Sequence, residues 1–85
     1  MKVTVLYFAS LREQLGVARE DVELPDGVHT AGALREHLAG RGGAWQSALA
    51  GPKLLRMAVN QDMAKPAAAI RAGDEVAFFP PVTGG

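Results

Sequence analysis

Residues 73–85 read GDEVAFFPPVTGG and combine a strand with an unusual end. The pair Gly-Asp favours a turn, and the run Glu-Val-Ala-Phe-Phe at 75–79 then alternates as a half-buried strand does. Pro80 and Pro81 fix φ and lack an amide hydrogen, so they end the strand and favour an extended backbone. The stretch therefore predicts a last strand that leads directly into an extended tail, residues 80–85.

The composition of the tail favours an extended segment that ends in residues without side chains. Val82 and Thr83 favour an extended backbone, and six residues at about 3.3 Å each span about 20 Å. Gly84 and Gly85 carry no side chains and accept unusual φ and ψ, which suits a narrow channel. A frayed terminus is the alternative, since most termini have no other role. We predict a functional tail whose tip threads into a partner.

Such a tip has one obvious chemistry. A carboxylate is a poor electrophile, but its transfer to the α-phosphorus of ATP gives an acyl-adenylate, which a sulfur donor can convert into a thiocarboxylate. The chain contains no phosphate-binding glycine loop, so another protein must perform the adenylation. It also contains no cysteine, so no internal thiol can capture the activated tip.

The rest of the chain predicts a small mixed sheet. Residues 2–8 alternate as a first strand, Ser10-Leu11-Arg12-Glu13 reads as a capping box that opens a short helix, and Gly16 closes it. A second strand follows at 21–24, and Thr30 caps a longer helix.

The second half of the chain adds the remaining elements. One more helical turn is expected around Trp45, a third strand at 54–60, a short edge strand near Met63 and a core plug at Ile70. The simplest packing is an α+β roll of the ubiquitin-like (β-grasp) type. It has a mixed sheet of four or five strands with one main helix on one face. We expect one domain over residues 1–79 and the tail after it.

One set of apolar side chains points away from this core. In a β-grasp sheet the first and last strands are adjacent and parallel, so their outward residues meet. The expected exposed stripe comprises Leu6, Phe8, Ala77 and Phe79, and Met63 is a candidate fifth member. We interpret it as a docking surface beside the tail, and burial under a loop is the alternative.

Composition excludes several other functions. Nine basic residues balance nine acidic ones, so nothing points to nucleic acid or to a membrane as partner. His29 and His37 have no partner at metal-ligand spacing, so we expect no metal site. The absence of cysteine and of a signal peptide fits a cytoplasmic protein.

Three stretches resemble a known family, the small subunit of molybdopterin synthase (MoaD). They are VLYFA at 5–9 running into LRE at 11–13, AVNQ at 58–61, and above all the complete 73–85 stretch. The resemblance covers nearly the whole chain and implies a β-grasp fold.

The resemblance also implies a reaction cycle. An E1-like adenylating enzyme of the MoeB type would consume ATP to form a transient acyl-AMP at Gly85, and a sulfurtransferase would supply sulfur. No cofactor would be bound apart from the resulting thiocarboxylate. Gly84 would let the tail thread, and Pro80 to Thr83 would form its stalk. The tail would enter the large subunit, MoaE, in a heterotetramer, and sulfurate cyclic pyranopterin monophosphate to give the dithiolene of molybdopterin.

Three other functions stay open from the sequence. A carrier for thiamine thiazole synthesis also ends in Gly-Gly, although the Phe-Phe-Pro-Pro-Val-Thr stalk argues against it. A ubiquitin-like modifier would use the same activated terminus for conjugation to lysines. A plain interaction module would have an inert terminus.

Overall fold

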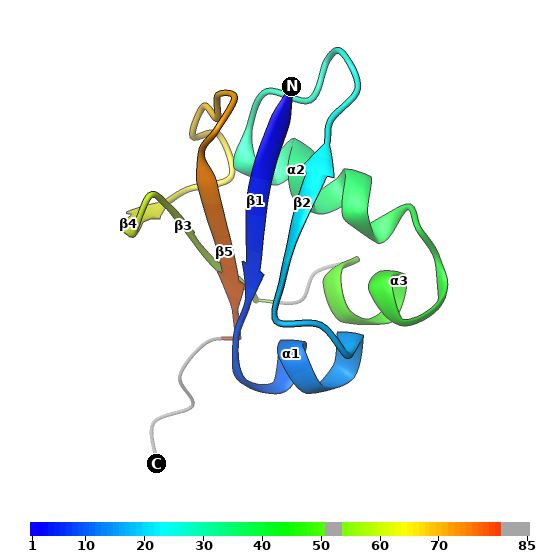
Figure 1. Ribbon diagram of the computed structural model, residues 1–85. Coiled ribbons are helices and arrows are strands. Elements are labelled where there is room, and N and C mark those ends of the chain that lie inside the picture. The colour runs from blue at the N-terminus through cyan, green and yellow to red at the C-terminus, as the bar shows by residue number, and fades with distance from the viewer. Residues whose placement is uncertain (51–53, 81–85) are drawn as a thin grey trace.

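A computed structural model describes residues 1–50 and 54–80. A five-stranded sheet forms one layer, and three short helices lie behind it and at its lower end (Figure 1). The elements, in chain order, are β1 (Lys2–Tyr7), α1 (Ala9–Leu15), β2 (Arg19–Glu23), α2 (Ala31–Ala39), α3 (Gly43–Leu49), β3 (Arg56–Val59), β4 (Asp62–Ala64) and β5 (Glu75–Phe79). The chain has the β-grasp fold that the sequence predicted.

The sheet has the strand order β2-β1-β5-β3-β4. β1 and β5 are parallel and adjacent, as predicted, and every other neighbouring pair is antiparallel. The last strand therefore lies at the centre of the sheet, with the first strand on one side and β3 on the other. The segment that follows β5 therefore continues from the end of the central strand, not from an edge strand.

The helices cover one face of the sheet, and α2 contributes most to the core. The Thr30 hydroxyl accepts a hydrogen bond from the amide of Ala33 at 3.1 Å, which is the predicted N-cap. Ala31, Leu34 and Leu38 then point to the sheet and are fully buried. Opposite them lie the inward side chains of the central strands, which include Val3, Val5, Tyr7, Val76 and Phe78.

The predicted capping box at Ser10 is wrong. The helix α1 begins one residue earlier, at Ala9, and its N-cap is Phe8, whose side chain makes no capping hydrogen bond. Ala9 takes a positive φ of 53°, so the chain turns sharply out of β1 before Ser10 is reached. Gly16 does end the helix, in the left-handed conformation with φ 74°, as predicted.

The loop between β4 and β5 is held against the start of α2. Ile70 is 4% exposed and plugs the core as predicted. The amides of Ala31 and Gly32 donate to the carbonyls of Ala68 and Pro66, so backbone hydrogen bonds join this alanine-rich stretch to the first turn of α2. Within the described part of the chain, no helix is long and apolar enough to cross a membrane.

Candidate functional site

An apolar groove crosses the open face of the sheet, opposite the helices. It has a volume of about 480 Å³. We call it the docking groove; its lining residues are Leu6, Phe8, Ala58, Gln61, Met63, Glu75, Ala77 and Phe79. It contains all five residues of the predicted stripe and three that the sequence reasoning missed.

Strand register explains why these side chains meet. Leu6 of β1 pairs with Ala77 of β5, Ala77 pairs with Ala58 of β3, and Ala58 pairs with Met63 of β4. Residues paired across neighbouring strands point to the same face, so these four form one row across the sheet. The small alanines in the middle leave a depression between the longer side chains of Leu6 and Met63.

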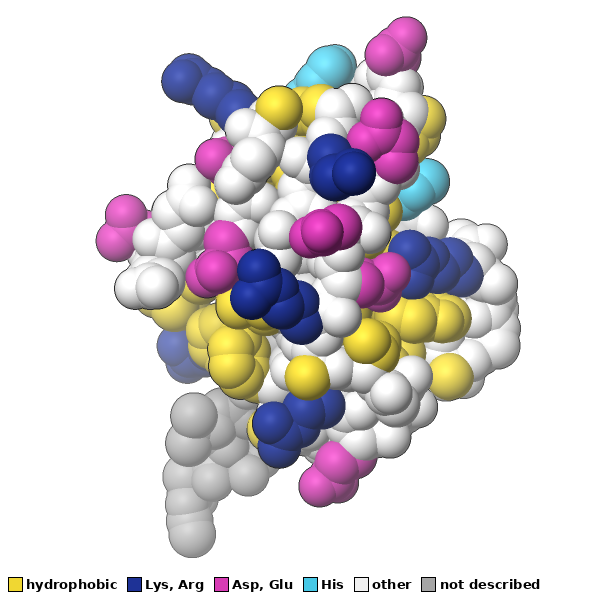
Figure 2. Space-filling view, in the orientation of Figure 1, with side chains coloured by type: hydrophobic (Ala, Val, Ile, Leu, Met, Phe, Trp, Pro, Cys, Tyr) yellow, Lys and Arg dark blue, Asp and Glu magenta, His cyan; other side chains and the backbone are white. Residues whose placement is uncertain are grey.

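Two phenylalanines border the groove at the end where β5 stops. Phe8 and Phe79 pack edge to face, with ring centroids 6.3 Å apart and planes at 81°. In Figure 2 hydrophobic side chains gather at the lower left of this face, beside the C-terminal end of β5, with charged side chains above them. The groove therefore lies directly at the root of the tail.

The stripe is only partly exposed. Phe8 is 45% exposed and Met63 60%, whereas Leu6 and Phe79 are half-buried. Ala77 was expected to be exposed, but it is 8% exposed and counts as buried. Its single methyl group points outward as predicted, yet it sits at the floor of the groove, between longer neighbours.

The sequence reasoning missed Ala58, Gln61 and Glu75. The alternation that places Met57 inward turns Ala58 outward, so this signal was available. Alternation likewise turns Glu75 to the face of Ala77 and Phe79, whereas nothing in the pattern places Gln61, in the β3–β4 turn, beside the start of β5.

A polar clamp fixes that turn. Asn60 and Gln61 have positive φ values of 50° and 71°, and the Asn60 side chain donates to the Asp74 carboxylate at 3.1 Å. The Asn60 amide oxygen accepts from the backbone amide of Glu75 at 3.0 Å. The Asn60 hydrogen bond, followed by one from the Arg71 amide, lowers the pKa of Asp74 below its ordinary value. The clamp holds Glu75 and the β3–β4 turn in fixed positions along the groove.

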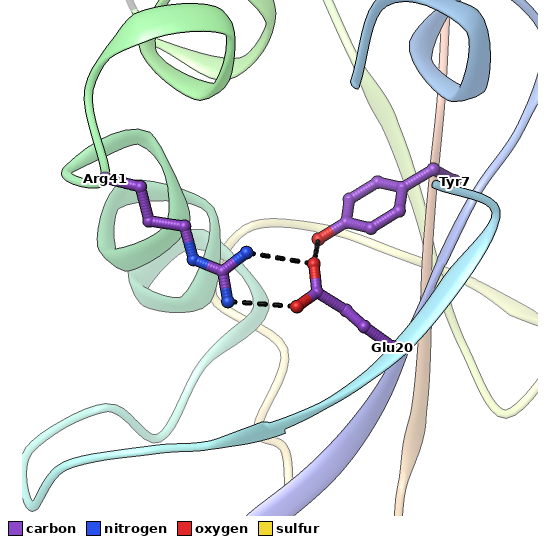
Figure 3. A network of polar contacts seen from close by, with 3 residues as sticks. All are labelled: Tyr7, Glu20 and Arg41. Atoms are coloured by element: carbon purple, nitrogen blue, oxygen red, sulfur yellow. Dashed lines mark hydrogen bonds and ion pairs between the residues drawn. The ribbon is translucent and has the colours of Figure 1, made fainter. Parts of the chain in front are cut away.

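A second polar cluster lies on the other side of the sheet (Figure 3). Arg41 holds both carboxylate oxygens of Glu20, at 2.9 and 3.0 Å, and the Tyr7 hydroxyl donates to Glu20 at 2.9 Å. Arg41 also lies 4.5 Å from the centre of the Trp45 ring. Burial, followed by the hydrogen bond to Glu20, raises the pKa of Tyr7 far above its ordinary value, so the phenol stays protonated. This cluster ties β1, β2 and the α2–α3 turn together and contains no reactive group.

The tail begins where the description of the chain ends. Pro80 is half-buried at the end of β5. The other predicted tail residues, Pro81 to Gly85, lie outside the described residues, as does the prediction of a flexible tail. In the described segments no group of three or more His, Asp or Glu side chains could hold a metal ion.

Comparisons with known proteins agree with this geometry. The chain matches the ThiS family over residues 5–85. It is 49% identical over 83 residues to the molybdopterin synthase sulfur carrier subunit of Haemophilus influenzae, covering 98% of this chain and 99% of the relative.

Two solved structures show how widely this fold is shared. SAMP1 of Haloferax volcanii has a TM-score of 0.81 and 33% identity, with 100% of both chains covered. Subunit 1 in a protein–protein complex with subunit 2 of the molybdopterin-converting factor of Helicobacter pylori has a TM-score of 0.67 and 21% identity, with full coverage of both chains. At that identity the second likeness establishes the fold alone.

The family match spans nearly all of the chain and includes the tail that the groove adjoins. The relatives named as molybdopterin synthase sulfur carrier subunits are 37–49% identical. The chain therefore belongs to the ThiS/MoaD family of ubiquitin-like proteins.

Proposed function

We propose that this chain is the sulfur carrier subunit of a molybdopterin synthase and that Gly85 carries the sulfur. The observation that supports this most strongly is the 49% identity, over 98% of the chain, to a relative with that name. The residues add a physical reason, because a strand at the centre of the sheet leads into a slender Gly-Gly tail beside an apolar groove.

The proposed loading has three steps. An oxygen of the Gly85 carboxylate attacks the α-phosphorus of ATP in an E1-like adenylating enzyme, and pyrophosphate leaves. The terminal sulfur of a sulfurtransferase persulfide then attacks the acyl carbon, and AMP leaves. A thiol cleaves the resulting acyl disulfide, releasing the thiocarboxylate and forming a disulfide with the sulfurtransferase cysteine. The product is a thiocarboxylate at Gly85, a soft and readily ionised nucleophile.

Delivery requires a second partner. We propose that the large subunit receives the tail and that two thiocarboxylated tails in succession attack cyclic pyranopterin monophosphate there. Each forms one carbon–sulfur bond, and water then hydrolyses the acyl–sulfur bond, so that the Gly85 carboxylate leaves and the second transfer completes the dithiolene. A tail of six residues reaches about 20 Å, so the domain must dock close to that site. The docking groove at the tail's root is the natural contact, with Phe8 and Phe79 as anchors and Leu6, Ala77 and Met63 behind them. The Helicobacter pylori structure is named as a complex of two such subunits, which supports a heteromeric assembly.

Intact-mass analysis tests the loading. We expect the chain purified from its own cells to contain a fraction heavier by the exchange of one oxygen for sulfur. Incubation with ATP, the adenylating enzyme and a sulfur source should increase that fraction. Deleting Gly85 should abolish the mass shift while leaving thermal unfolding unchanged, because the core ends at Phe78. Sulfur on the shortened chain would overturn the assignment.

A protein modifier is the second candidate, because SAMP1 is a close structural neighbour and its name denotes a small archaeal modifier protein. The same experiment separates the two functions. A modifier should appear in cell extracts as isopeptide conjugates to lysines, whereas a dedicated carrier should appear only as the free acid and the thiocarboxylate.

A further inference from the structure

The docking groove is apolar except for the neutral amide of Gln61 and one anionic side chain, that of Glu75. Glu75 is the first residue of β5, and it lines the groove from the open face of the sheet. It is half-buried, and about 13 Å of strand separate it from Phe79 at the other end. A partner that covers this mostly apolar groove removes water from the carboxylate, and that desolvation is unfavourable unless the charge is paired.

Among the described residues, no side chain pairs with this carboxylate. The main chain of Glu75 is fixed, because its amide donates to the Asn60 side chain at 3.0 Å and its carbonyl accepts from the Asn60 amide at 2.8 Å. Its side chain, however, forms no hydrogen bond or ion pair with any of the residues at 1–50 and 54–80. Glu75 therefore presents an unpaired charge from a rigid base.

The charges around the groove differ between its two ends. Near Glu75 lie three carboxylates: Asp74, Asp21, which accepts from the Thr4 hydroxyl, and Glu23, which lies across the strands from Lys2. Lys2 and Arg71 are the cations at this end, so carboxylates including Glu75 outnumber them. At the tail end, Arg19 lies across from Leu6 and Arg56 across from Phe79. The open face is thus acidic where β5 begins and basic where it ends.

We infer that the docking groove receives an apolar side chain of the partner and that Glu75 pairs with a lysine or arginine next to it. This inference rests on the proposed function, in which the partner is the large subunit. An unpaired carboxylate buried in an interface is strongly unfavourable, so a partner that covers the groove must supply a cation. The opposite charges at the two ends allow one docking direction only, and that direction decides where the tail points.

The test is calorimetric titration of the purified large subunit from the same organism with four chains: wild type, Glu75→Gln, Glu75→Lys and Glu75→Asp. We expect Glu75→Gln to weaken binding about three- to tenfold at low salt and Glu75→Lys by at least about thirtyfold. Glu75→Asp keeps the charge and should retain most of the affinity. The affinity of wild type should fall with added salt, and that of Glu75→Gln should fall less steeply.

Glu36→Gln is the matched control, because Glu36 is an exposed glutamate on α2, on the other side of the sheet. It should bind as wild type does, and thermal unfolding should be nearly equal for all five chains. A Glu75→Gln chain with wild-type affinity and salt dependence would overturn the inference while leaving the proposed function intact. A wild-type chain that does not bind the large subunit would overturn the proposed function, and the inference with it. Self-association of the wild-type chain that Glu75→Gln abolishes would assign the groove to a second copy of this chain instead.

Discussion

At the scale of single residues, the pair Phe8 and Phe79 lies on the open face of the sheet, outside the core cluster. Their edge-to-face contact is local, and Phe8 remains 45% exposed. The core is complete without them, since Tyr7 and Phe78, their neighbours in sequence, fill the interior and are almost fully buried. A partner that buried their remaining exposed area would gain a favourable hydrophobic contribution to the binding free energy.

We predict that Phe79→Ala or Phe8→Ala weakens binding of the large subunit about tenfold or more. Burying the face of one phenylalanine contributes roughly 1.5–3 kcal/mol, and each 1.4 kcal/mol is about a factor of ten in Kd. The free energy of unfolding should fall by less, about 1 kcal/mol, because both side chains already keep solvent contact.

Calorimetric affinity beside thermal unfolding checks this prediction. Leu54→Ala is the control, since Leu54 is 80% exposed but does not line the groove, and it should change neither quantity. Phenylalanine variants that are stable and bind normally would leave the tail alone to hold the complex.

The outward side chains of β1 and β5 could be predicted from sequence because residues alternate between the two faces along a strand. Once Val76 and Phe78 face the core, Phe79 must face outward, and the parallel pairing of β1 and β5 brings Phe8 to it. The same rule cannot give depth, so the burial of Ala77 was missed. Alternation does put Glu75 on the same outward face as Ala77 and Phe79, but it cannot show that the β3–β4 turn, some fifteen residues away in sequence, packs beside it.

At the scale of elements, the β3–β4 turn is joined to the start of β5 by side-chain hydrogen bonds. Asn60 bridges the Asp74 carboxylate and the Glu75 amide, and the Arg71 amide also donates to Asp74. These contacts hold β4, with Met63, beside the groove. The sequence predicted the short edge strand near Met63 but not the contact of the β3–β4 turn with the start of β5.

Asp74→Asn should reduce stability at neutral pH but not in acid. The pKa of Asp74 is lowered from its ordinary value of 3.8, first by the Asn60 side chain and then by the Arg71 amide. A lowered pKa means that the ionised carboxylate favours the folded state. Its contribution is therefore complete above 3.8 and disappears as the pH falls through the lower, folded-state pKa.

Because Asp74 is largely solvated, we expect the difference from wild type to be less than about 1 kcal/mol. Chemical denaturation of both chains at neutral pH and at a pH below 3.8 measures it. Asp26→Asn, in the exposed turn after β2, is the control and should differ little from wild type at either pH. A difference that persists undiminished in acid would mean that the carboxylate charge does not support the clamp.

The two ends of α1 show where element prediction succeeds and fails. Gly16 was predicted because a helix that ends in a left-handed residue strongly prefers glycine. Ser10 was assigned as the cap because Ser-x-x-Glu is the usual signature, but the core position of Leu11 decides the helix start instead. With Leu11 inward and Phe8 bonded to Phe78 through its amide, the chain turns at Ala9 and leaves Ser10 inside the helix.

At the scale of the whole molecule, the proposed function assigns folding, docking and sulfur transport to separate parts of the chain. The core lies between the sheet and the helices, the docking groove lies on the opposite face, and the proposed reacting atom lies beyond the end of β5. The Glu20–Arg41 pair and Tyr7 brace the helical side without touching the groove. A change to one part should therefore leave the others working, which is testable in a mixed assembly.

We predict that a chain lacking Gly84 and Gly85 inhibits molybdopterin formation by the intact complex. It keeps the groove and so should occupy the large subunit, but it has no terminal glycine to load with sulfur. With equal affinity for both chains, an equimolar mixture should give about half the initial rate of sulfur transfer of the wild-type chain alone when large-subunit sites are limiting. The measurement is single-turnover conversion of cyclic pyranopterin monophosphate with preloaded wild-type carrier.

The same truncation combined with Phe79→Ala is the matched control and should inhibit far less, because docking is then weakened. If the simple truncation fails to inhibit, the last two glycines contribute most of the binding energy, and the groove is not the principal contact with the large subunit.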